Sequence, residues 1–177
     1  MRVIAGCLGG RTLVAPRGRA IRPTSDRVRE AVFAILGPLE GAHVLDLFAG
    51  SGALAIEALS RGAATATLID TSPAAIAAIR LNLERLSLSA EVRRADALRF
   101  LEHARAASWQ YDLVFVDPPY RRARELGRRL SEPIAAVLGP GARVVLESDR
   151  RSPAELALPL LDERCYGETM IRIHGSR

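Results

Sequence analysis

An Asp-Pro-Pro-Tyr run is the strongest candidate for chemistry in this sequence. Its residues are Asp117, Pro118, Pro119 and Tyr120, and they follow residues 111–116, an apolar run typical of a buried strand. Two consecutive prolines lack N–H groups and disfavour helix at the residue before each, which predicts a stiff, extended turn. The turn would present the Asp117 carboxylate and the Pro118 carbonyl as acceptors beside the ring of Tyr120. Such a set suits a planar heterocycle that carries an NH₂ group.

The chemistry that this turn predicts is attack by an exocyclic amine. Such an amine is a poor nucleophile because its lone pair is delocalised into the ring. Hydrogen bonds from its two N–H groups to Asp117 and Pro118 would favour a pyramidal nitrogen and stabilise the positive charge that develops as the nitrogen attacks a methyl group. Stacking on Tyr120 would hold the base in line with the bond that breaks. The alternative is a proline turn that merely ends a strand.

A second signal is the glycine turn between Asp46 and Ala55. Gly50 and Gly52 stand where an expected strand turns into an expected helix, so that a ligand can approach the backbone. Asp70 follows Gly50 by 20 residues, at the end of the next expected strand, where a carboxylate can accept hydrogen bonds from both hydroxyls of a ribose. A nucleoside-containing cofactor is therefore expected. Its predicted contacts are Thr24, Asp46, Phe48, Ala49, Gly50, Ser51, Gly52, Asp70, Thr71, Asp96, Ala97 and Asp117.

The same glycine spacing also suits a dinucleotide, so a nicotinamide oxidoreductase is an alternative. Asp46 argues against it, because a carboxylate just before the turn would repel a pyrophosphate but could face the cationic end of a ligand that carries an amino acid. S-adenosylmethionine has an ammonium, a sulfonium and a ribose but no phosphate. Asp96 could accept from an adenine amino group, or could simply cap the helix that begins near Leu98. S-adenosylmethionine is the expected cofactor.

The elements that must position these residues alternate between β-branched runs and helical stretches, which predicts an α/β fold with a largely parallel sheet. Residues 2–8 and 11–15, joined by Gly9-Gly10, predict a β-hairpin. A helix capped by Thr24 or Ser25 should end at Gly37-Pro38. The expected strands are 44–48, 65–70, 91–95, 113–116, 143–147 and a closing antiparallel pair, 163–166 and 169–174; the expected helices are 53–61, 73–86, 97–106 and 122–138. A basic hairpin and linker, residues 1–23, would precede a main domain, residues 24–177.

The basic charge is concentrated at one end of the 177-residue chain. Residues 1–29 hold seven arginines against Asp26 alone, a local +6 in a chain whose net charge is +5. This favours a polyanion such as RNA as partner, against the alternative of a merely solvated basic surface. The candidate contacts are Arg2, Arg11, Arg17, Arg19, Arg22 and Arg27, with Arg121 and Arg122 after the Asp-Pro-Pro-Tyr run.

Composition and spacing exclude several other classes of protein. With 49% hydrophobic and 25% charged residues, the chain is not expected to be disordered. The three histidines share no ligand spacing, so no metal site is expected. No run approaches the length of a membrane span and the first residues do not resemble a signal peptide, which predicts a cytoplasmic protein.

Four segments together resemble the bacterial 16S ribosomal RNA guanine-N2 methyltransferases. They are Arg22–Glu30, Leu45–Leu54, Glu57–Ala63 and Asp117–Tyr120. The last motif alone also occurs in DNA adenine, RNA and protein-glutamine N-methyltransferases, but its combination with Arg22-Pro23-Thr24 is specific. Two departures are Asp70, where many relatives have glutamate, and Ala34, where many have asparagine.

The resemblance implies a Rossmann-like class I methyltransferase fold with a central seven-stranded sheet and S-adenosylmethionine as methyl donor. The implied acceptor is the N2 of guanine 966 in 16S rRNA, within a 30S particle or a late assembly intermediate. Thr24 would lie against the methionine end of the cofactor, and the basic hairpin would hold rRNA. An N-methyltransferase of another RNA or DNA amine, or a noncatalytic rRNA-binding assembly factor, is the alternative, and a monomer is expected.

Overall fold

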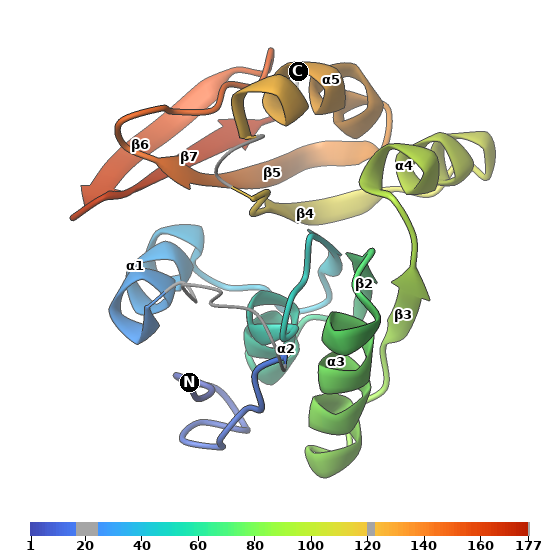
Figure 1. Cartoon of the computed structure of the whole chain (residues 1–177), viewed down its shortest axis with the longest axis vertical. Helices are drawn as coiled ribbons and strands as arrows, with labels where there is room; N and C mark the ends of the chain where they lie inside the picture. The colour runs from blue at the N-terminus through green and yellow to red at the C-terminus, as the bar shows by residue number, and fades with distance from the viewer. Residues whose placement is uncertain (17–24, 120–122, 177) are drawn as a thin grey trace. The chain divides into compact units, whose positions relative to one another are not determined.

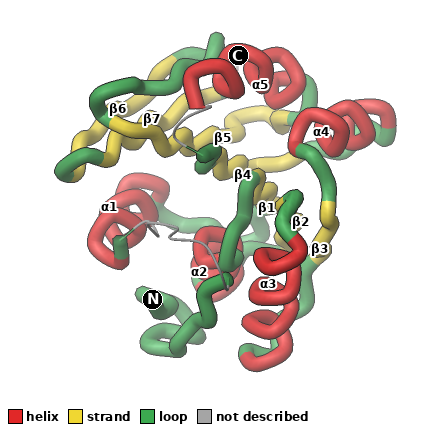
Figure 2. Tube along the Cα trace, viewed as in Figure 1, coloured by secondary structure: helices red, strands yellow, loops and turns green. Residues whose placement is uncertain are grey.

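The structure is a computed structural model that describes residues 1–16, 25–119 and 123–176. The chain divides into two compact units, Met1–Ala95 and Asp96–Arg177. Their helices and strands are labelled in Figure 1, except β1, which is labelled in Figure 2. The first unit contains α1 (Asp26–Leu36), β1 (His43–Leu47), α2 (Ala53–Ser60), β2 (Thr65–Asp70), α3 (Pro73–Arg85) and β3 (Glu91–Arg94). The second contains α4 (Ala97–Ala106), β4 (Tyr111–Val116), α5 (Ala123–Ala135), β5 (Leu138–Asp149), β6 (Leu160–Tyr166) and β7 (Thr169–Gly175).

The first unit is a three-stranded parallel arrangement covered by helices. Its strands lie in the order β3-β2-β1, and α2 and α3 pack on them. Successive side chains of β1 point to opposite faces of the strand, and Val44, Leu45 and Leu47 are all fully buried. Burial on both faces is expected for a strand in a covered parallel sheet. Because β1 and β2 run in parallel, the residues that follow them meet at one edge, and this edge carries the glycine turn and Asp70.

The second unit is mixed. Its strand order is β4-β5-β7-β6, with β4 parallel to β5 and with β7 antiparallel to both of its neighbours. The expected closing hairpin is confirmed, with its turn at Gly167-Glu168, and it begins earlier than predicted, at Leu160. Figure 2 shows these strands in yellow with α5, in red, packed on β5. No helix among the residues that the structure describes is long and apolar enough to cross a membrane.

The N-terminal segment (residues 1–16) differs from the hairpin predicted for it. The chain does turn back, and Val3 N–H donates to the Arg11 carbonyl at 2.9 Å, but only Arg2 and Thr12 form a bridge. The reason lies in α2, whose side chains take the donors that a ladder would need. Ile4 N–H donates to Glu57 Oε2 at 2.6 Å and Ala5 N–H to Glu57 Oε1 at 3.0 Å.

Ser60 and Arg29 complete this attachment. Ser60 Oγ accepts from Leu8 N–H at 3.0 Å and donates to the Ala5 carbonyl at 2.6 Å. From α1, the buried Arg29 donates through Nη2 to the Arg2 carbonyl at 2.5 Å. The segment is therefore held against the rest of the first unit by hydrogen bonds to side chains of α1 and α2, and not by a β-ladder of its own. It lies beside α2 in Figure 1.

The predicted helix 122–138 is also corrected. Its described part, α5, ends at Ala135, two residues after Pro133, and β5 begins at Leu138 instead of residue 143. Leu138 pairs with Tyr111 at the start of β4, and a register shift follows before Leu113 meets Arg143. The first residues of β5, from Leu138 to residue 142, are predicted by the sequence pattern to lie at the end of the helix and in the loop that follows it.

Gly6 and Gly10 offer a matched test of the packing of the N-terminal segment. Both have a positive φ, +81° and +84°, but a Cβ on Gly6 would collide with the Ser60 carbonyl, whereas nothing lies within 4 Å of one on Gly10. Gly10→Ala should lower the free energy of unfolding by about 1 kcal/mol, the cost of a left-handed alanine. Gly6→Ala should lower it by about 3 kcal/mol, because steric overlap adds to that cost. Urea unfolding checks this, and equal losses in the two variants would contradict it.

Candidate active site

The glycine turn lies at the carboxyl end of β1 and leads into α2. Phe48 has φ +65°, which is unusual for a residue with a side chain and costs of order 1 kcal/mol. Gly52 caps α2 in the left-handed region, and a Cβ there would come within 2.9 Å of Leu68 Cδ2. At Gly50 the only atom near such a Cβ would be the Phe48 carbonyl oxygen, at 3.9 Å. Gly52 is therefore required by packing, while Gly50 leaves open space beside the backbone.

Asp70 joins the glycine turn to the end of β2. Its Oδ2 accepts from Gly50 N–H at 3.0 Å, and its Oδ1 accepts from Ser72 N–H at 2.8 Å. Each carboxylate oxygen has two acceptor positions, so one position on each remains for the hydroxyls of a ribose. The backbone bonds also hold the carboxylate in place at the edge where β1 and β2 end. Contact between Asp70 and the hydroxyls of a ribose stays a prediction.

Asp46 is a buried carboxyl group behind the same turn. It is 1% exposed, and its Oδ2 accepts from Ala55 N–H at 3.3 Å in the first turn of α2. Burial raises the pKa of Asp46 to about 7, against the hydrogen bond from Ala55, which lowers it, and with the nearby charge of Asp70, which raises it further. A cation next to this group would stabilise its ionised form.

These carboxylates argue against a dinucleotide. A pyrophosphate binds at a helix N-terminus through free backbone N–H groups and the positive end of the helix dipole. In this protein Asp70 takes the N–H of Gly50, and Asp46 takes that of Ala55. The Asp70 carboxylate and the ionised fraction of Asp46 would repel a phosphate close to the start of α2, whereas a cation would stabilise the ionised form of Asp46. A ligand with a cationic amino-acid end therefore fits better than a dinucleotide.

Asn82 and Met1 also reach the glycine turn, and the sequence analysis missed both. Asn82 Nδ2 donates to the Ser51 carbonyl at 2.9 Å, and Ser51 Oγ lies 3.6 Å from Met1 Sδ. A signal for Asn82 exists in the sequence, since it follows Ile79 by three positions and so falls on the apolar stripe of its helix. A polar residue at such a position requires a buried partner.

Asp96 and Ala97 begin the second unit. Asp96 caps α4, where its Oδ1 accepts from Leu98 N–H at 3.0 Å and from Arg99 N–H at 3.3 Å. Asp96 is exposed and Ala97 is buried. The capping role is thus realised, and contact between Asp96 and an adenine amino group stays a prediction.

The Asp117-Pro118-Pro119 turn follows β4 directly, as predicted. Asp117 is partly exposed, Pro118 is buried and Pro119 is exposed. Neither proline has an N–H group, so the turn contributes acceptors without competing donors at these two positions. The turn and the glycine turn belong to different units of the structure.

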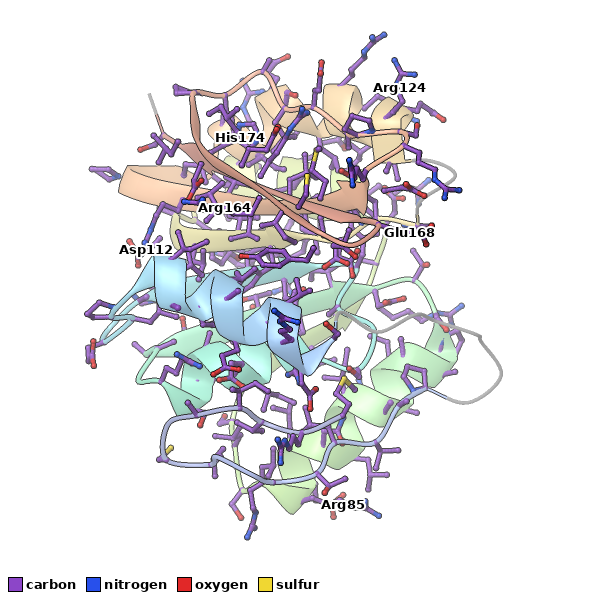
Figure 3. The ribbon with its side chains drawn as sticks, turned by 90° about the vertical axis from the view of Figure 1, so that its left-hand side faces the viewer. Arg85, Asp112, Arg124, Arg164, Glu168 and His174 are labelled. Carbon is purple, nitrogen blue, oxygen red and sulfur yellow. The ribbon has the colours of Figure 1, made fainter. Side chains whose placement is uncertain are left out.

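Several predicted residues lie outside the described part of the chain. They are Thr24 and Tyr120 and the arginines Arg17, Arg19, Arg22, Arg121 and Arg122. Of the other predicted RNA contacts, Arg2, Arg11 and Arg27 are all exposed in the first unit. Figure 3 labels Arg124, an exposed residue of α5 in the second unit.

This chain is similar to known proteins over nearly its whole length. The family described as "Conserved hypothetical protein 95" matches residues 1–175. This chain belongs to that family. Ribosomal RNA small subunit methyltransferase D of Escherichia coli (strain K12) is 45% identical over 124 residues, which cover 69% of this chain and 61% of that protein. The protein of the same name from Haemophilus influenzae is 33% identical over 188 residues, 98% of this chain and 93% of its own.

Solved structures confirm the predicted fold class. One from Escherichia coli has a TM-score of 0.80 and 36% identity, with 100% of this chain and 98% of that chain covered. A hypothetical protein of Thermus thermophilus has a TM-score of 0.84 and 31% identity, with 98% of both chains covered. A 16S rRNA N2 G1207 methyltransferase of Thermus thermophilus, solved with AdoMet and guanosine, shares the fold at 22% identity and a TM-score of 0.70, with 91% of this chain and 44% of that chain covered.

The protein described here is a class I methyltransferase that uses S-adenosylmethionine. The residues of the first unit fit this cofactor. Asp70 keeps acceptor positions for ribose hydroxyls, and Asp46 is a buried carboxyl group that lacks a cationic partner among the contacts described above. The open space at Gly50 admits a ligand against the backbone.

The raised pKa of Asp46 predicts that cofactor binding releases a proton. Without ligand the group is largely protonated at pH 6, and a bound cation lowers its pKa. Affinity for S-adenosylhomocysteine, whose ammonium remains, should therefore rise between pH 6 and pH 8, by about fivefold if the pKa of Asp46 falls by one unit on binding and by at most about tenfold if it falls further. Isothermal titration calorimetry in buffers of different ionisation enthalpy measures the released proton.

Asp46→Asn serves as the control for this experiment. It should bind the ligand more weakly at pH 8 and show neither the proton release nor the rise in affinity. Without ligand, the stability of the wild type relative to Asp46→Asn should be greatest below pH 4 and should fall as pH rises to about 7, because the folded protein holds the Asp46 proton more tightly than the unfolded chain. Parallel pH profiles for the two proteins would contradict the assignment.

Proposed function

We propose that this protein transfers a methyl group from S-adenosylmethionine to the exocyclic N2 of guanine 966 in 16S rRNA. The observation that carries the proposal is the Asp117-Pro118-Pro119 turn at the carboxyl end of β4, in a chain whose first unit provides the carboxylates for the cofactor. The similarity to ribosomal RNA small subunit methyltransferase D supports 16S rRNA as the substrate class. The particular base and atom follow from the family resemblance.

In this mechanism the residues of β4 and its turn activate the amine. When bound, S-adenosylmethionine supplies an electrophilic methyl group on its sulfonium. The Asp117 carboxylate and the Pro118 carbonyl accept hydrogen bonds from the two N–H groups of the guanine amine, which frees its lone pair. The N–C bond then forms as the C–S bond breaks with its electron pair on sulfur. Asp117 stabilises the positive charge on nitrogen, which is removed when the methylated amine releases a proton to water.

Tyr120 is proposed to stack on the guanine ring and to hold it in line with the breaking bond. Thr24, Phe48, Ala49, Ser51, Thr71, Asp96 and Ala97 are proposed to complete the cofactor site. The mechanism requires that the glycine turn and the Asp117 turn face the same substrate. It also requires an unstacked guanine, because the amine of a paired base is not accessible.

The proposed partner is 16S rRNA within the 30S subunit or a late assembly intermediate, engaged by a cytoplasmic monomer. Exposed arginines of the first unit, Arg2, Arg11 and Arg27, are proposed to contact phosphates. Arg17, Arg19, Arg22, Arg121 and Arg122 are proposed to do so as well, on the basis of sequence. Mapping of methylated guanine at nucleotide resolution in 16S rRNA, from cells with and without this protein, tests the assignment directly. Loss of methylation at another nucleotide, or at none, would refute it.

Asp117→Ala separates catalysis from cofactor binding. It should lower kcat on 30S subunits at least about 100-fold, the typical effect of removing an acceptor that stabilises transition-state charge. The Kd for S-adenosylhomocysteine should stay within about threefold of the wild-type value. Although the sequence also predicts that Asp117 borders the cofactor, the ribose and the ammonium are assigned to Asp70 and Asp46, and the Asp117 carboxylate is assigned to the substrate amine. Single-turnover methylation and calorimetry measure the two quantities. Full activity in this variant would exclude the mechanism.

Arg11→Ala tests the electrostatic contact with RNA. The logarithm of the 30S binding constant should fall less steeply with the logarithm of salt concentration, with a slope smaller by about one unit, if Arg11 neutralises one phosphate. Arg164→Ala is the matched control, because it removes an exposed arginine of β6 that pairs with Asp162 and has no proposed role. The location of Arg164 can be followed in Figure 3. An equal change in slope for both variants would argue against a specific contact by Arg11.

A further inference from the structure

Asn82 is a buried amide for which the proposed mechanism has no role. It is the only asparagine in the sequence, it lies in α3 and it is 1% exposed. Its Oδ1 accepts from Val14 N–H at 2.8 Å, while its Nδ2 donates to the Val14 carbonyl at 3.0 Å and to the Ser51 carbonyl at 2.9 Å. All of its donors and one acceptor position are thus used. One planar group joins the N-terminal segment to the glycine turn.

The bond to Ser51 determines the orientation of a peptide plane in that turn. The Ser51 carbonyl and the Gly52 N–H belong to the same rigid peptide unit. The Gly52 N–H donates to the Ala49 carbonyl at 2.7 Å, so rotation of the plane would break bonds on both of its sides. Asn82 therefore helps to fix the backbone conformation on which the cofactor is proposed to lie.

The N-terminal segment is connected to the same region at further points. Met1 Sδ lies 3.6 Å from Ser51 Oγ, and Glu57 of α2 binds the backbone of Ile4 and Ala5. The helix α2 begins at the glycine turn, so the segment contacts both that turn and the helix that continues it. The exposed Arg2 and Arg11 belong to the segment, and they are proposed to bind RNA.

We propose that Asn82 is a positioning residue that couples the N-terminal segment to the glycine turn, so that RNA binding and cofactor binding strengthen each other. RNA that holds the segment in place would favour the conformation in which Asn82 orients the Ser51–Gly52 peptide. By linkage, a cofactor that favours this conformation of the turn must tighten RNA binding by the same factor. The coupling rests on the function proposed above and adds a route between its two ligands.

The test measures the Kd of radiolabelled S-adenosylhomocysteine with and without saturating 30S subunits from cells that lack this protein. In the wild type the subunits should tighten the binding at least about fivefold. In Asn82→Ala this ratio should fall to about one, while each ligand still binds by itself. Asn82→Asp should behave in the same way, because its carboxylate keeps an acceptor for Val14 N–H but has no donor for the Ser51 and Val14 carbonyls.

Ser131→Ala is the matched control for a general loss of buried hydrogen bonds. Ser131 is buried in the second unit, where its Oγ donates to the Gly127 carbonyl at 2.8 Å and accepts from Ala157 N–H at 2.9 Å. This variant should keep the wild-type ratio. Since the near-isosteric Asn82→Asp removes the same bond to Ser51 with little change in volume, it decides the matter if Asn82→Ala does not fold.

The outcomes distinguish the coupling from the function on which it rests. A wild-type ratio of one, with both ligands bound, would overturn the coupling and leave the proposed function intact. A fivefold ratio that persists in the Asn82 variants would overturn the role of Asn82. Failure of the wild type to bind or methylate 30S subunits would overturn the proposed function, and the coupling with it.

Discussion

The start of helix α2 is occupied by the protein's own carboxylates, and this constraint determines which ligand can bind there. Asp70 accepts from Gly50 N–H and Asp46 from Ala55 N–H, so groups that could hold a phosphate are already paired. The negative charge at this end of the helix repels anions and favours a cation. In the proposed site, a cofactor with a ribose on Asp70 and a cationic amino-acid end near Asp46 would satisfy both groups. This arrangement would account for a methyltransferase with a glycine turn similar to that of dinucleotide-binding proteins.

The two ends of α2 serve different purposes within the first unit. Its beginning continues the glycine turn, and its later residues Glu57 and Ser60 bind the backbone of the N-terminal segment. The N-terminal segment is too short to form a core of its own. Contacts with the rest of the first unit, including hydrogen bonds to buried side chains, hold it in place. The segment is therefore attached to the helix that continues the glycine turn, and the proposed coupling between RNA and cofactor depends on this attachment.

The proposed substrate side depends on a different property, the absence of N–H groups at Pro118 and Pro119. Pro118 and Pro119 have no N–H groups, and the Asp117 carboxylate accepts only, so the turn after β4 is complementary to an amine that must donate two hydrogen bonds. A hydroxyl group has one hydrogen to donate and would leave one acceptor unpaired. Such a turn complements any exocyclic amine, so in the proposed function the choice of base would have to come from other contacts with the RNA.

The sequence by itself was sufficient to locate the proline turn after β4, the glycine turn before α2, Asp70 at the end of β2 and most helices and strands. Each of these depends on residues close together in the chain: prolines after a strand, glycines before a helix, and apolar periodicity. The catalytic and cofactor-binding roles of these residues stay predictions. The sequence was not sufficient for the N-terminal segment, where Glu57 and Ser60 of α2 take the backbone donors of a predicted hairpin. It did not identify Asn82, whose partners Val14 and Ser51 lie 68 and 31 positions away. Nor could it reveal the raised pKa of Asp46, because burial of a charge is decided by the packing of elements that are distant in the sequence.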